Sequence, residues 1–576
     1  MRKLFLKRSK YLFRQFLLLG SFASYWLFAL ACGAEPRSPI QLSDITKETG
    51  ITFVHTDGSS GNRYIVETVA SGLATFDYNN DGRIDILFLN GASLPGAPSQ
   101  ASRSRNALYR NEGGWRFTDV TDAAGIGDGA YHLGVCVGDY DNDGDLDIFL
   151  NNFGPNILYR NNGNETFTNV TQAAGLAGNT HVGAGASFLD IEGDGDLDLF
   201  VANYVDFTFE AHHIGHMNGL PAYVGPLNYP STSNVLFRNN GDETFTDISK
   251  EAGIAMLKGA GMGVIAADFD NDRDSDLIVG NDLRPDFVLR NDGAGKFKEV
   301  GALLGVAYDS FGNVLGSMGI ECADWNHDGW LDLYVTPYQR QLAPLFQNQK
   351  GKYFEDVTRR TGAASGTYSQ VKWGVGMVDL DNDTHRDIFV ACGHLIDNVD
   401  QFDTSTSYSE RNVLLRNTGD GKFVDVSNQS GDGLLPKLSS RGAAFDDLDN
   451  DGDLDVVVLN SRSAPTILRN DTKKTNHWLQ IQLQGKKSNR DGVGARVTVR
   501  SGDLEQIDEV HSGRSYQSDF GKRLQFGLGS RRLVEEIRVQ WIGGGVDLVR
   551  NVPVDRLIKI VEQRGLVTDA APNQKP

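Results

Sequence analysis

Hydrophobic and polar positions follow one pattern that returns seven times along the chain. Small and aliphatic residues, as in 185–189, precede an acidic loop, and a short apolar run, as in 147–150, follows it. Two further segments complete each repeat, of the kind seen at Asn156 to Asn161 and at Phe117 to Thr121. Short apolar runs bounded by turn residues predict β-strands, here four in each repeat. The pattern therefore predicts an all-β fold, a seven-bladed β-propeller.

The two ends of the repeat array complement each other. Thr466 to Asn470 follows the seventh acidic loop, but no segment of the Phe-Thr-Asp-Val-Thr kind comes after it. Leu42 to Thr46 has that character and no preceding loop, so we predict that residues 42–46 supply the outermost strand of the seventh blade. Glycines five positions before each loop predict close packing of the innermost strands. These glycines are Gly72, Gly134, Gly185, Gly263, Gly319, Gly374 and Gly442.

Each acidic loop has the form Asp-x-Asp/Asn-x-Asp-Gly-x-x-Asp. Oxygen-bearing side chains at positions 1, 3, 5 and 9 of a tight loop surround one point with hard ligands, which predicts calcium binding, with up to seven ions in total. An EF-hand is excluded because position 12, such as Phe88 or Leu150, is apolar. The predicted ligands are Asp77, Asn79, Asp81 and Asp85; Asp139, Asp141, Asp143 and Asp147; Asp190, Glu192, Asp194 and Asp198; Asp268, Asp270, Asp272 and Asp276; Asp324, Asn326, Asp328 and Asp332; Asp379, Asp381, Asp383 and Asp387; and Asp447, Asp449, Asp451 and Asp455.

The seven loops are not equivalent. Arg273 and Thr384 replace the glycine at position 6, where a positive φ is costly for other residues, so the fourth and sixth sites should be strained or weak. Glu192 lengthens one ligand of the third loop. The second and seventh loops keep every feature of the pattern, and we expect them to bind calcium best.

The final block of the chain predicts a separate small β-sandwich or barrel. Trp478 to Leu483, Ala495 to Arg500 and Ile537 to Trp541 alternate apolar and polar residues with period two, as half-buried strands do. We expect the propeller to span residues 42–472, this β domain residues 473–565, and a disordered tail residues 566–576.

These motifs resemble a known family. The acidic loops with Leu-Tyr-Arg-Asn and Phe-Thr-Asp-Val-Thr segments are similar to FG-GAP/VCBS repeats, calcium-loop propellers that also occur in integrin α chains. Asp491 to Val497, His511 to Tyr516, Phe526 to Gly529 and Val539 to Trp541 resemble the ASPIC/UnbV domain of the cartilage acidic protein family in its bacterial form. The resemblance implies an exported calcium-binding propeller with an appended β domain, and it implies no defined enzymatic activity.

The N-terminus predicts export. Six basic residues precede or begin an apolar run from about Phe16 to Ala31, the pattern of a signal peptide over residues 1–31, with a linker at 32–41. Two alternatives remain open, cleavage after Ala31 or lipidation at Cys32, which would be the only attachment to a membrane. We expect the protein in the cell envelope, as an outer-membrane lipoprotein or in the periplasm, or secreted.

Charge and cysteine content exclude some classes of partner and of covalent chemistry. The chain carries 75 acidic and 55 basic residues, a net charge of −20, which argues against a nucleic-acid partner. Cys136, Cys322 and Cys392 are too scattered for a disulfide framework and should occupy small buried positions.

Two places could carry other chemistry. Extra residues at 203–233 include His212, His213 and His216, which could bind a transition metal or simply pack with aromatic rings. Residues that could converge at the mouth of the propeller channel are Glu67, His132, His181, Lys258, Lys372 and Arg441. We therefore expect an extracellular or envelope module that binds or adheres to a protein or glycan. The alternative is an enzyme or enzyme-accessory protein with its site at the channel mouth or in the insertion.

Overall fold

The computed structural model describes residues 37–97, 104–178 and 181–570, and from Ile40 onward these form one compact unit. The predicted signal peptide and Cys32 lie outside the described residues. Within these ranges, no helix is both long and apolar enough to cross a membrane.

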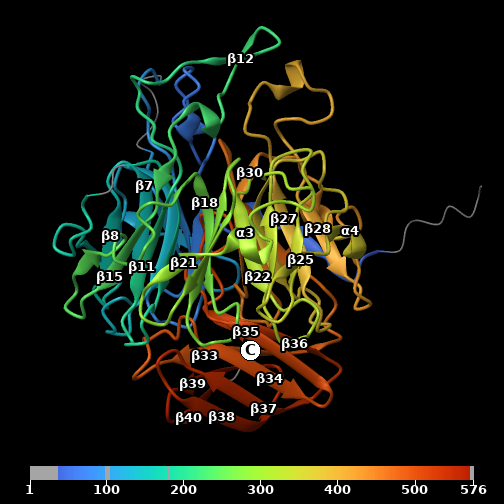
Figure 1. Cartoon of the computed structure of the whole chain (residues 1–576). Helices are drawn as coiled ribbons and strands as arrows, with labels where there is room; N and C mark the ends of the chain where they lie inside the picture. Colours follow the sequence, from blue (N-terminus) through green and yellow to red (C-terminus); the bar gives the residue numbers. More distant parts are fainter. Residues whose placement is uncertain (1–36, 98–103, 179–180, 571–576) are drawn as a thin grey trace, which may run out of the picture. The chain divides into compact units, whose positions relative to one another are not determined.

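Seven four-stranded antiparallel sheets, the blades, follow one another through residues 40–470 of the described chain (Figure 1). Blade 1 contains β2 (Leu73–Phe76), β3 (Asp85–Phe88), β4 (Ala107–Asn111) and β5 (Phe117–Asp119). Blade 2 contains β6 (Tyr131–Gly138), β7 (Asp147–Phe153), β8 (Ile157–Asn161) and β9 (Phe167–Asn169). Blade 3 contains β10 (Gly183–Leu189), β11 (Asp198–Asn203), β15 (Val235–Asn239) and β16 (Phe245–Asp247).

The remaining blades repeat this order. Blade 4 contains β18 (Gly261–Ala267), β19 (Asp276–Asn281), β20 (Phe287–Asn291) and β21 (Phe297–Glu299). Blade 5 contains β22 (Gly319–Ala323), β23 (Asp332–Thr336), β24 (Leu345–Asn348) and β25 (Phe354–Asp356). Blade 6 contains β26 (Lys372–Val378), β27 (Asp387–Cys392), β28 (Val413–Asn417) and β29 (Phe423–Asp425). Blade 7 contains β30 (Ser440–Asp446), β31 (Asp455–Asn460), β32 (Thr466–Asn470) and β1 (Leu42–Asp44).

The ring closes as the sequence predicts. Strand β1, from the start of the described chain, pairs antiparallel with β32, with Leu42 opposite Asn470 and Asp44 opposite Leu468. The innermost strand of each blade contacts that of the next, and β30 of blade 7 contacts β2 of blade 1. The prediction that residues near 42–46 complete the last blade is therefore confirmed, and the all-β propeller with it.

Small residues allow the innermost strands to approach one another. A Cβ atom placed on Gly134 would lie 1.9 Å from the carbonyl oxygen of Ala184 in the next blade. Aliphatic and aromatic side chains fill the space between blades, and Cys136, Cys322 and Cys392 are buried there as free thiols, as predicted.

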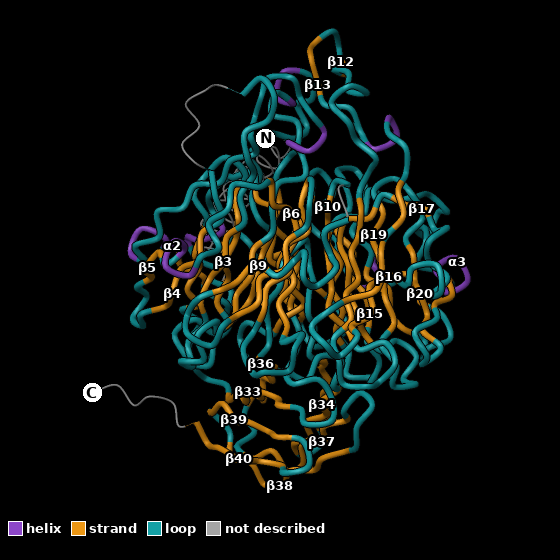
Figure 2. The backbone as a smooth tube through the Cα atoms, turned by 90° about the vertical axis from the view of Figure 1, so that its left-hand side faces the viewer, coloured by secondary structure: helices purple, strands orange, loops and turns teal. Residues whose placement is uncertain are grey.

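Short connecting elements lie outside the blades. They are the α-helices α2 (Thr121–Ala124), α3 (Gly301–Leu304) and α4 (Thr358–Thr361), the 3-10 helices η1 (Thr46–Glu48), η2 (Ile65–Glu67), η3 (Pro226–Asn228), η4 (Val399–Gln401) and η5 (Asp432–Leu434), and the short strands β12 (Gly215–Met217), β13 (Leu220–Ala222), β14 (Thr232–Ser233) and β17 (Lys258–Gly259). Strands β12 and β13 form a hairpin that projects from the side of the propeller away from the C-terminal sheets (Figures 1 and 2).

Two further four-stranded sheets make up the C-terminal domain (Figure 2). One contains β36 (Arg523–Gly529), β33 (His477–Gln484), β39 (Arg556–Val561) and β40 (Gly565–Ala570), and the other β35 (Leu504–Glu509), β34 (Arg496–Ser501), β37 (Leu533–Gln540) and β38 (Val546–Pro553). Residues of both sheets share a core with blades 2 and 3.

The predicted disordered tail needs correction, because residues 566–570 continue β40. That strand pairs with β39, with Leu557 opposite Ala570, and so completes the edge of the first sheet. The apolar pair Leu566 and Val567 was the signal for a strand, and residues 571–576 lie outside the described part of the chain.

A segment of the C-terminal domain fills the propeller channel, which the sequence did not predict. We call residues 511–521 the plug. Ser515 exchanges two backbone hydrogen bonds with Ile320 of blade 5, and Asp519 lies beside β2, receiving one from Thr75 and giving one to Leu73. Tyr516 is fully buried and donates its hydroxyl to the carbonyl oxygen of Val69. The plug thus pairs with strands from opposite parts of the ring.

Closure of the ring can be tested at β1. Leu42 is fully buried between β32 and η5, so Leu42→Ala should lower the free energy of unfolding by about 2–5 kcal/mol. Urea denaturation measures this. The exposed neighbour variant Lys47→Ala is the control, and equal midpoints for the two variants would contradict the closure.

The plug can be tested at its buried ion pair. The guanidinium of Arg514 lies 2.5 Å from the carboxylate of Glu321, and the two side chains are 6% and 0% exposed. Arg514→Met leaves a buried, unpaired carboxylate and should lower the free energy of unfolding by about 3–5 kcal/mol. The double variant Arg514→Met/Glu321→Met should regain most of that free energy.

The solvent-exposed pair Arg500 and Glu505 provides the matched control, and Arg500→Met should leave the denaturation midpoint unchanged. If the double variant is as unstable as Arg514→Met alone, the plug is not held by this pair.

Candidate metal-binding loops

The acidic loops join the first and second strands of each blade and share one internal hydrogen-bond arrangement. In the second loop, Asp139 Oδ1 accepts from the backbone N–H of Asp143 at 3.0 Å and Oδ2 from that of Gly144 at 2.8 Å. The first aspartate of every other loop accepts the same two bonds; these residues are Asp77, Asp190, Asp268, Asp324, Asp379 and Asp447. The first carboxylate therefore folds the loop around itself.

Four loops bring three carboxylates together within 4.8 Å of one another. The groups are Asp139, Asp141 and Asp143; Asp268, Asp270 and Asp276; Asp379, Asp381 and Asp387; and Asp447, Asp449 and Asp455. In the part of the chain that the structure describes, the first, third and fifth loops form no such group of three. In the first loop Asp81 instead pairs with Arg83 at 2.8 Å. Sequence reasoning distinguished the loops by the residues at positions 3 and 6, whereas the structure distinguishes them by which loops gather three carboxylates.

The two loops without glycine at position 6 have the backbone that the sequence predicts. Arg273 has φ of 82° and Thr384 has φ of 91°, in the region that favours glycine. Both loops nevertheless gather their carboxylates as closely as the second and seventh loops do. The strain is therefore local to one residue, and their weaker binding stays a prediction.

Burial and mutual repulsion make these carboxylates difficult to ionise alone. Burial, and then the nearby charge of Asp491, raise the pKa of Asp139 to about 8; burial and then Asp451 raise that of Asp447 to about 7. Several buried oxygens have no hydrogen-bond partner among the described residues, namely Asp270 Oδ1, Asp332 Oδ2 and Asp381 Oδ1. Clustered, unpartnered carboxylate oxygens suit a hard divalent cation, which would hold them ionised.

Sequence reasoning missed an asparagine that links each loop to the one before it. The last carboxylate of the second loop, Asp147, accepts from the backbone N–H of Asn161 at 2.8 Å. The Asn161 side chain donates to the carbonyl oxygen of Tyr78, in the loop of the preceding blade, at 2.8 Å. The equivalent bonds run from Asn111 to Leu448, Asn239 to Tyr140, Asn291 to Ile191, Asn348 to Phe269, Asn417 to Trp325 and Asn470 to Leu380.

We call these seven bonds the asparagine ring. Since the bond from Asn111 reaches back to blade 7, the ring is closed. Its signal in the sequence was the asparagine that recurs at the end of the third strand of every repeat.

The C-terminal domain covers the face that carries the loops. Its side chains and backbone bind to loops of several blades. These contacts are Arg523 to the carbonyl oxygen of Gly82, the Arg490 N–H to Asn142, Arg496 to the carbonyl oxygen of Asp268, Asn476 to that of Asp381, and Gln480 to the Asp447 carboxylate. The loops are therefore candidate ion-binding sites and also form the contact surface between the propeller and the C-terminal domain.

The residues predicted at the channel mouth do not form a site. Lys372 is buried and donates to four carbonyl oxygens, those of Tyr338, Gln341, Thr367 and Gln370. Arg441 is buried over the Trp373 ring, and His132 is buried against Asn152 and Asp128. His181 and Lys258 are exposed. The plug occupies the channel toward which these side chains were expected to point.

The histidines of the insertion are also separate. His212 Nε2 donates to the carbonyl oxygen of Asn62 at 2.7 Å, and its Nδ1 lies 3.2 Å from the Tyr229 hydroxyl. The His212 ring packs edge-on against Tyr64, with 4.7 Å between ring centroids. His213 and His216 are exposed. Among the described residues of the insertion no group of three metal-ligating side chains comes together. The aromatic-packing interpretation of this segment is the one that the structure supports.

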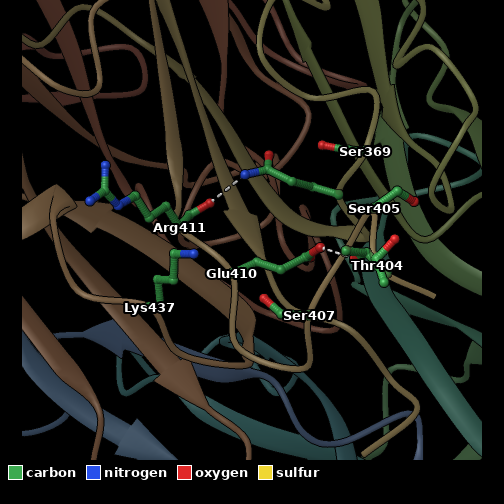
Figure 3. Close-up of a pocket in the computed structure, with 9 residues that line it drawn as sticks. Ser369, Thr404, Ser405, Ser407, Glu410, Arg411 and Lys437 are labelled. Atoms are coloured by element: carbon green, nitrogen blue, oxygen red, sulfur yellow. Dashed lines mark hydrogen bonds between the residues drawn. The ribbon is translucent and has the colours of Figure 1, made fainter. Parts of the chain in front are cut away.

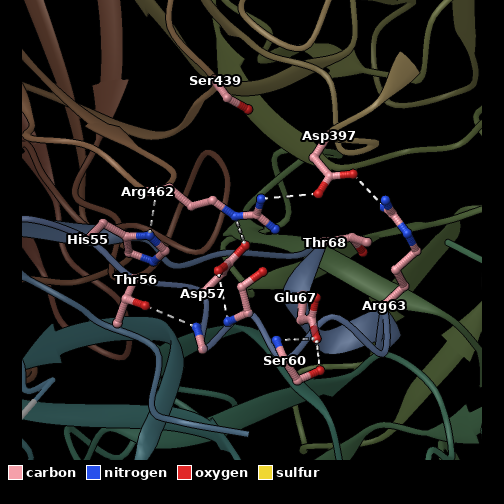
Figure 4. Close-up of polar contacts among 12 residues, drawn as sticks. His55, Thr56, Asp57, Ser60, Arg63, Glu67, Thr68, Asp397, Ser439 and Arg462 are labelled. Atoms are coloured by element: carbon pink, nitrogen blue, oxygen red, sulfur yellow. Dashed lines mark hydrogen bonds and ion pairs between the residues drawn. The ribbon is translucent and has the colours of Figure 1, made fainter. Parts of the chain in front are cut away.

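Buried and half-buried charged side chains form a network at the start of the described chain (Figure 4), and Tyr223 links the insertion to it. Arg462 of blade 7 pairs with Asp57 and, at 3.3 Å, with Asp397, which also pairs with Arg63. Tyr223 of the insertion donates to Glu67 at 2.8 Å. Each charged group here has a partner of opposite charge or a hydrogen-bond donor, so the network fastens loops together. This also accounts for Glu67, the last of the residues predicted at the channel mouth.

Comparisons with known proteins agree with this geometry. A family model described as an FG-GAP-like repeat matches residues 77–150, 139–201, 222–279, 268–335 and 379–458, and the model described as ASPIC and UnbV matches residues 485–567. Cartilage acidic protein 1 of Mus musculus is 24% identical over 514 residues, covering 85% of this chain and 73% of the relative. The Homo sapiens protein of that name is 24% identical, covering 85% and 71%.

Among solved structures, a lectin from Burkholderia pseudomallei is 10% identical, with a TM-score of 0.43, and the match covers 69% of this chain and 95% of the lectin. The repeat matches together span more than half of the sequence, over the blades and loops described above. The chain therefore belongs to the FG-GAP-like repeat family and carries an ASPIC and UnbV domain after its propeller.

Proposed function

We propose that this protein is an exported calcium-binding propeller that acts outside the cytoplasm as a binding or adhesion module for a protein or glycan. The observation that carries the calcium part is the pair of buried carboxylate oxygens without partners, Asp270 Oδ1 and Asp381 Oδ1, each in a loop that gathers three carboxylates within 4.8 Å of one another. A divalent cation bound by oxygen ligands removes both the repulsion and the missing contacts.

The second loop is the strongest of the candidate sites. Asp139, Asp141 and Asp143 have no ion pair with a basic side chain in the described part of the chain. In the seventh loop Lys474 lies 2.9 Å from Asp451, and in the sixth Arg416 lies 2.6 Å from Asp383, so a cation must compete with a resident positive charge. We therefore rank the second loop above the seventh, the other loop expected to bind best.

The face opposite the C-terminal domain is the surface that we assign to ligands. The C-terminal domain covers much of the loop face, where a pocket of about 770 Å³ remains beside the seventh loop, and the plug fills the channel. The opposite face carries neither obstruction. Of the groups proposed for the alternative, an enzyme or enzyme-accessory protein, Glu67, His132, Lys372 and Arg441 are engaged in structural contacts, and the exposed His181, Lys258, His213 and His216 belong to no group of three metal-ligating side chains among the described residues. Binding is thus the better supported of the two functions.

Export is supported by the basic residues and the apolar run in residues 1–31. We propose the cell envelope or the medium as its location. Cleavage after Ala31 and lipidation at Cys32 are separate outcomes, which mass spectrometry of the mature protein distinguishes.

Calcium should act mainly on stability. Extracellular modules bind calcium with dissociation constants of roughly 0.1–1 mM. When the calcium concentration is about 100 times the dissociation constant of a site, binding there raises the free energy of unfolding by about 2.7 kcal/mol. The midpoint temperature of thermal unfolding should therefore be well above that in EGTA when millimolar calcium is present. Elemental analysis should find several calcium ions in each chain.

The second loop tests the assignment to individual residues. Asp139→Asn/Asp143→Asn should lose one bound calcium and part of the thermal shift, whereas the exposed control Asp503→Asn should change neither. Identical melting in EGTA and calcium, or unchanged calcium content in the double variant, would contradict the proposal. For ligand binding, a calcium-loaded protein that retains no glycan on an array and no envelope component would contradict it.

A further inference from the structure

We propose that a polar pocket at the rim of blade 6 binds a sugar that carries a carboxylate, such as a uronic acid unit of a glycan. The inference rests on the proposed binding function and narrows its ligand. The pocket has a volume of about 620 Å³, within the usual range for small-molecule sites (Figure 3).

The strand order places this pocket on the open face. Ser369 and Gln370 come directly before β26, and Lys437 comes shortly before β30. Residues 404–411 connect β27 to β28. Since each acidic loop follows the first strand of a blade, all three segments lie at the strand ends away from those loops and from the C-terminal domain.

Hydroxyl groups dominate the lining. Ser369 and the consecutive residues 404–407, which are Thr, Ser, Thr and Ser, supply five hydroxyls, and Gln370 adds an amide. No aliphatic or aromatic side chain is among the described residues that line it. The hydroxyls of Ser405, Thr406 and Ser407 already donate to Asp403, Glu410 and the carbonyl oxygen of Ser409, so toward a sugar they act as acceptors. Ser369 and Thr404 can both donate and accept, as the hydroxyl groups of a sugar require.

The floor of the pocket is fixed before any ligand arrives. Glu410 is buried; one of its carboxylate oxygens accepts from the Thr406 hydroxyl at 2.7 Å and the other from the backbone N–H of Val371 at 2.9 Å. Its backbone exchanges hydrogen bonds of 2.8 and 3.0 Å with Leu438. Gln370 donates to the carbonyl oxygen of Arg411 at 3.0 Å. A preorganised wall lowers the entropy cost of binding.

The charges around the pocket favour an anion. Arg411 and Lys437 line it, and no ion pair or hydrogen bond engages the Lys437 ammonium in the part of the chain that the structure describes. Glu410 opposes them, but burial raises its pKa to about 7, so its charge is only partial at neutral pH. The lining thus carries two basic side chains and one buried carboxyl group. Hydroxyl partners and an unpaired cation together match an acidic sugar better than a neutral one.

The test compares matched probes on the calcium-loaded, full-length protein. Titration calorimetry with a digalacturonate should detect binding that weakens as salt rises, and a neutral galactose disaccharide of the same size should bind about tenfold or more weakly. Lys437→Glu should weaken digalacturonate binding about tenfold or more, whereas Lys473→Glu, an exposed lysine near the seventh loop, should not. Ser407→Ala should weaken both sugars if the hydroxyl wall contacts them.

Each other outcome overturns the inference. Equal affinity for the two disaccharides removes the role of charge, and binding of inorganic sulfate alone as tightly as digalacturonate reduces the pocket to a simple anion site. Unchanged binding in Lys437→Glu places the sugar elsewhere. If digalacturonate does not bind but other glycans or envelope proteins do, only this inference fails; if nothing is retained, the proposed function fails with it.

Discussion

The asparagine ring is the constraint on which the acidic loops depend. In each blade the last aspartate of the loop accepts a hydrogen bond from the backbone N–H of an asparagine. The side chain of that asparagine donates to a carbonyl oxygen of the previous loop, as Asn161 does to Tyr78. Each loop is therefore held both by hydrogen bonds of its own and by a bond from the neighbouring blade. The bond from Asn111 to Leu448 joins the first blade to the last, and its partners lie 337 residues apart in the sequence. This bond can form only when the ring is closed, which the pairing of β1 with β32 supports.

The same arrangement creates an electrostatic conflict. Holding Asp139 and Asp147 against backbone N–H groups requires their carboxylates to be buried close together, and burial raises the pKa of both. Protonation of the carboxylates would relieve their repulsion, but it would make them weaker acceptors for the backbone N–H groups. A divalent cation relieves the repulsion and keeps the carboxylates ionised as acceptors. Arg416 and Lys474 show a third solution, a resident side-chain cation at the edge of the cluster. The loops thus combine a structural duty with the candidate metal-binding one.

The sequence was sufficient for what depends on local periodicity. Strand positions, the acidic loops, the positive φ at Arg273 and Thr384 and the contribution of residues 42–44 to the last blade all follow from spacing and residue type. Contacts between distant segments were not predictable in the same way. Residues 511–519 are mostly polar, with three serines, and look like an exposed turn, yet they are buried because strands from several blades satisfy their polar groups. For the same reason Lys372 and Arg441 seemed available for chemistry, although the fold surrounds them with carbonyl oxygens and aromatic rings.

The plug also changes how the C-terminal motifs should be understood. His511 to Tyr516, part of the motif that marks this domain, makes contacts inside the channel: Arg514 neutralises Glu321, and Tyr516 packs against Trp373 at 4.9 Å. These side chains cannot contact a ligand in solution while they are buried there. Meanwhile Arg523 and Gln480 hold the loop face. Because this domain fills the channel and covers much of one face of the propeller, the opposite face, with Lys437 and the hydroxyl-lined pocket, is the one that we propose for recognition.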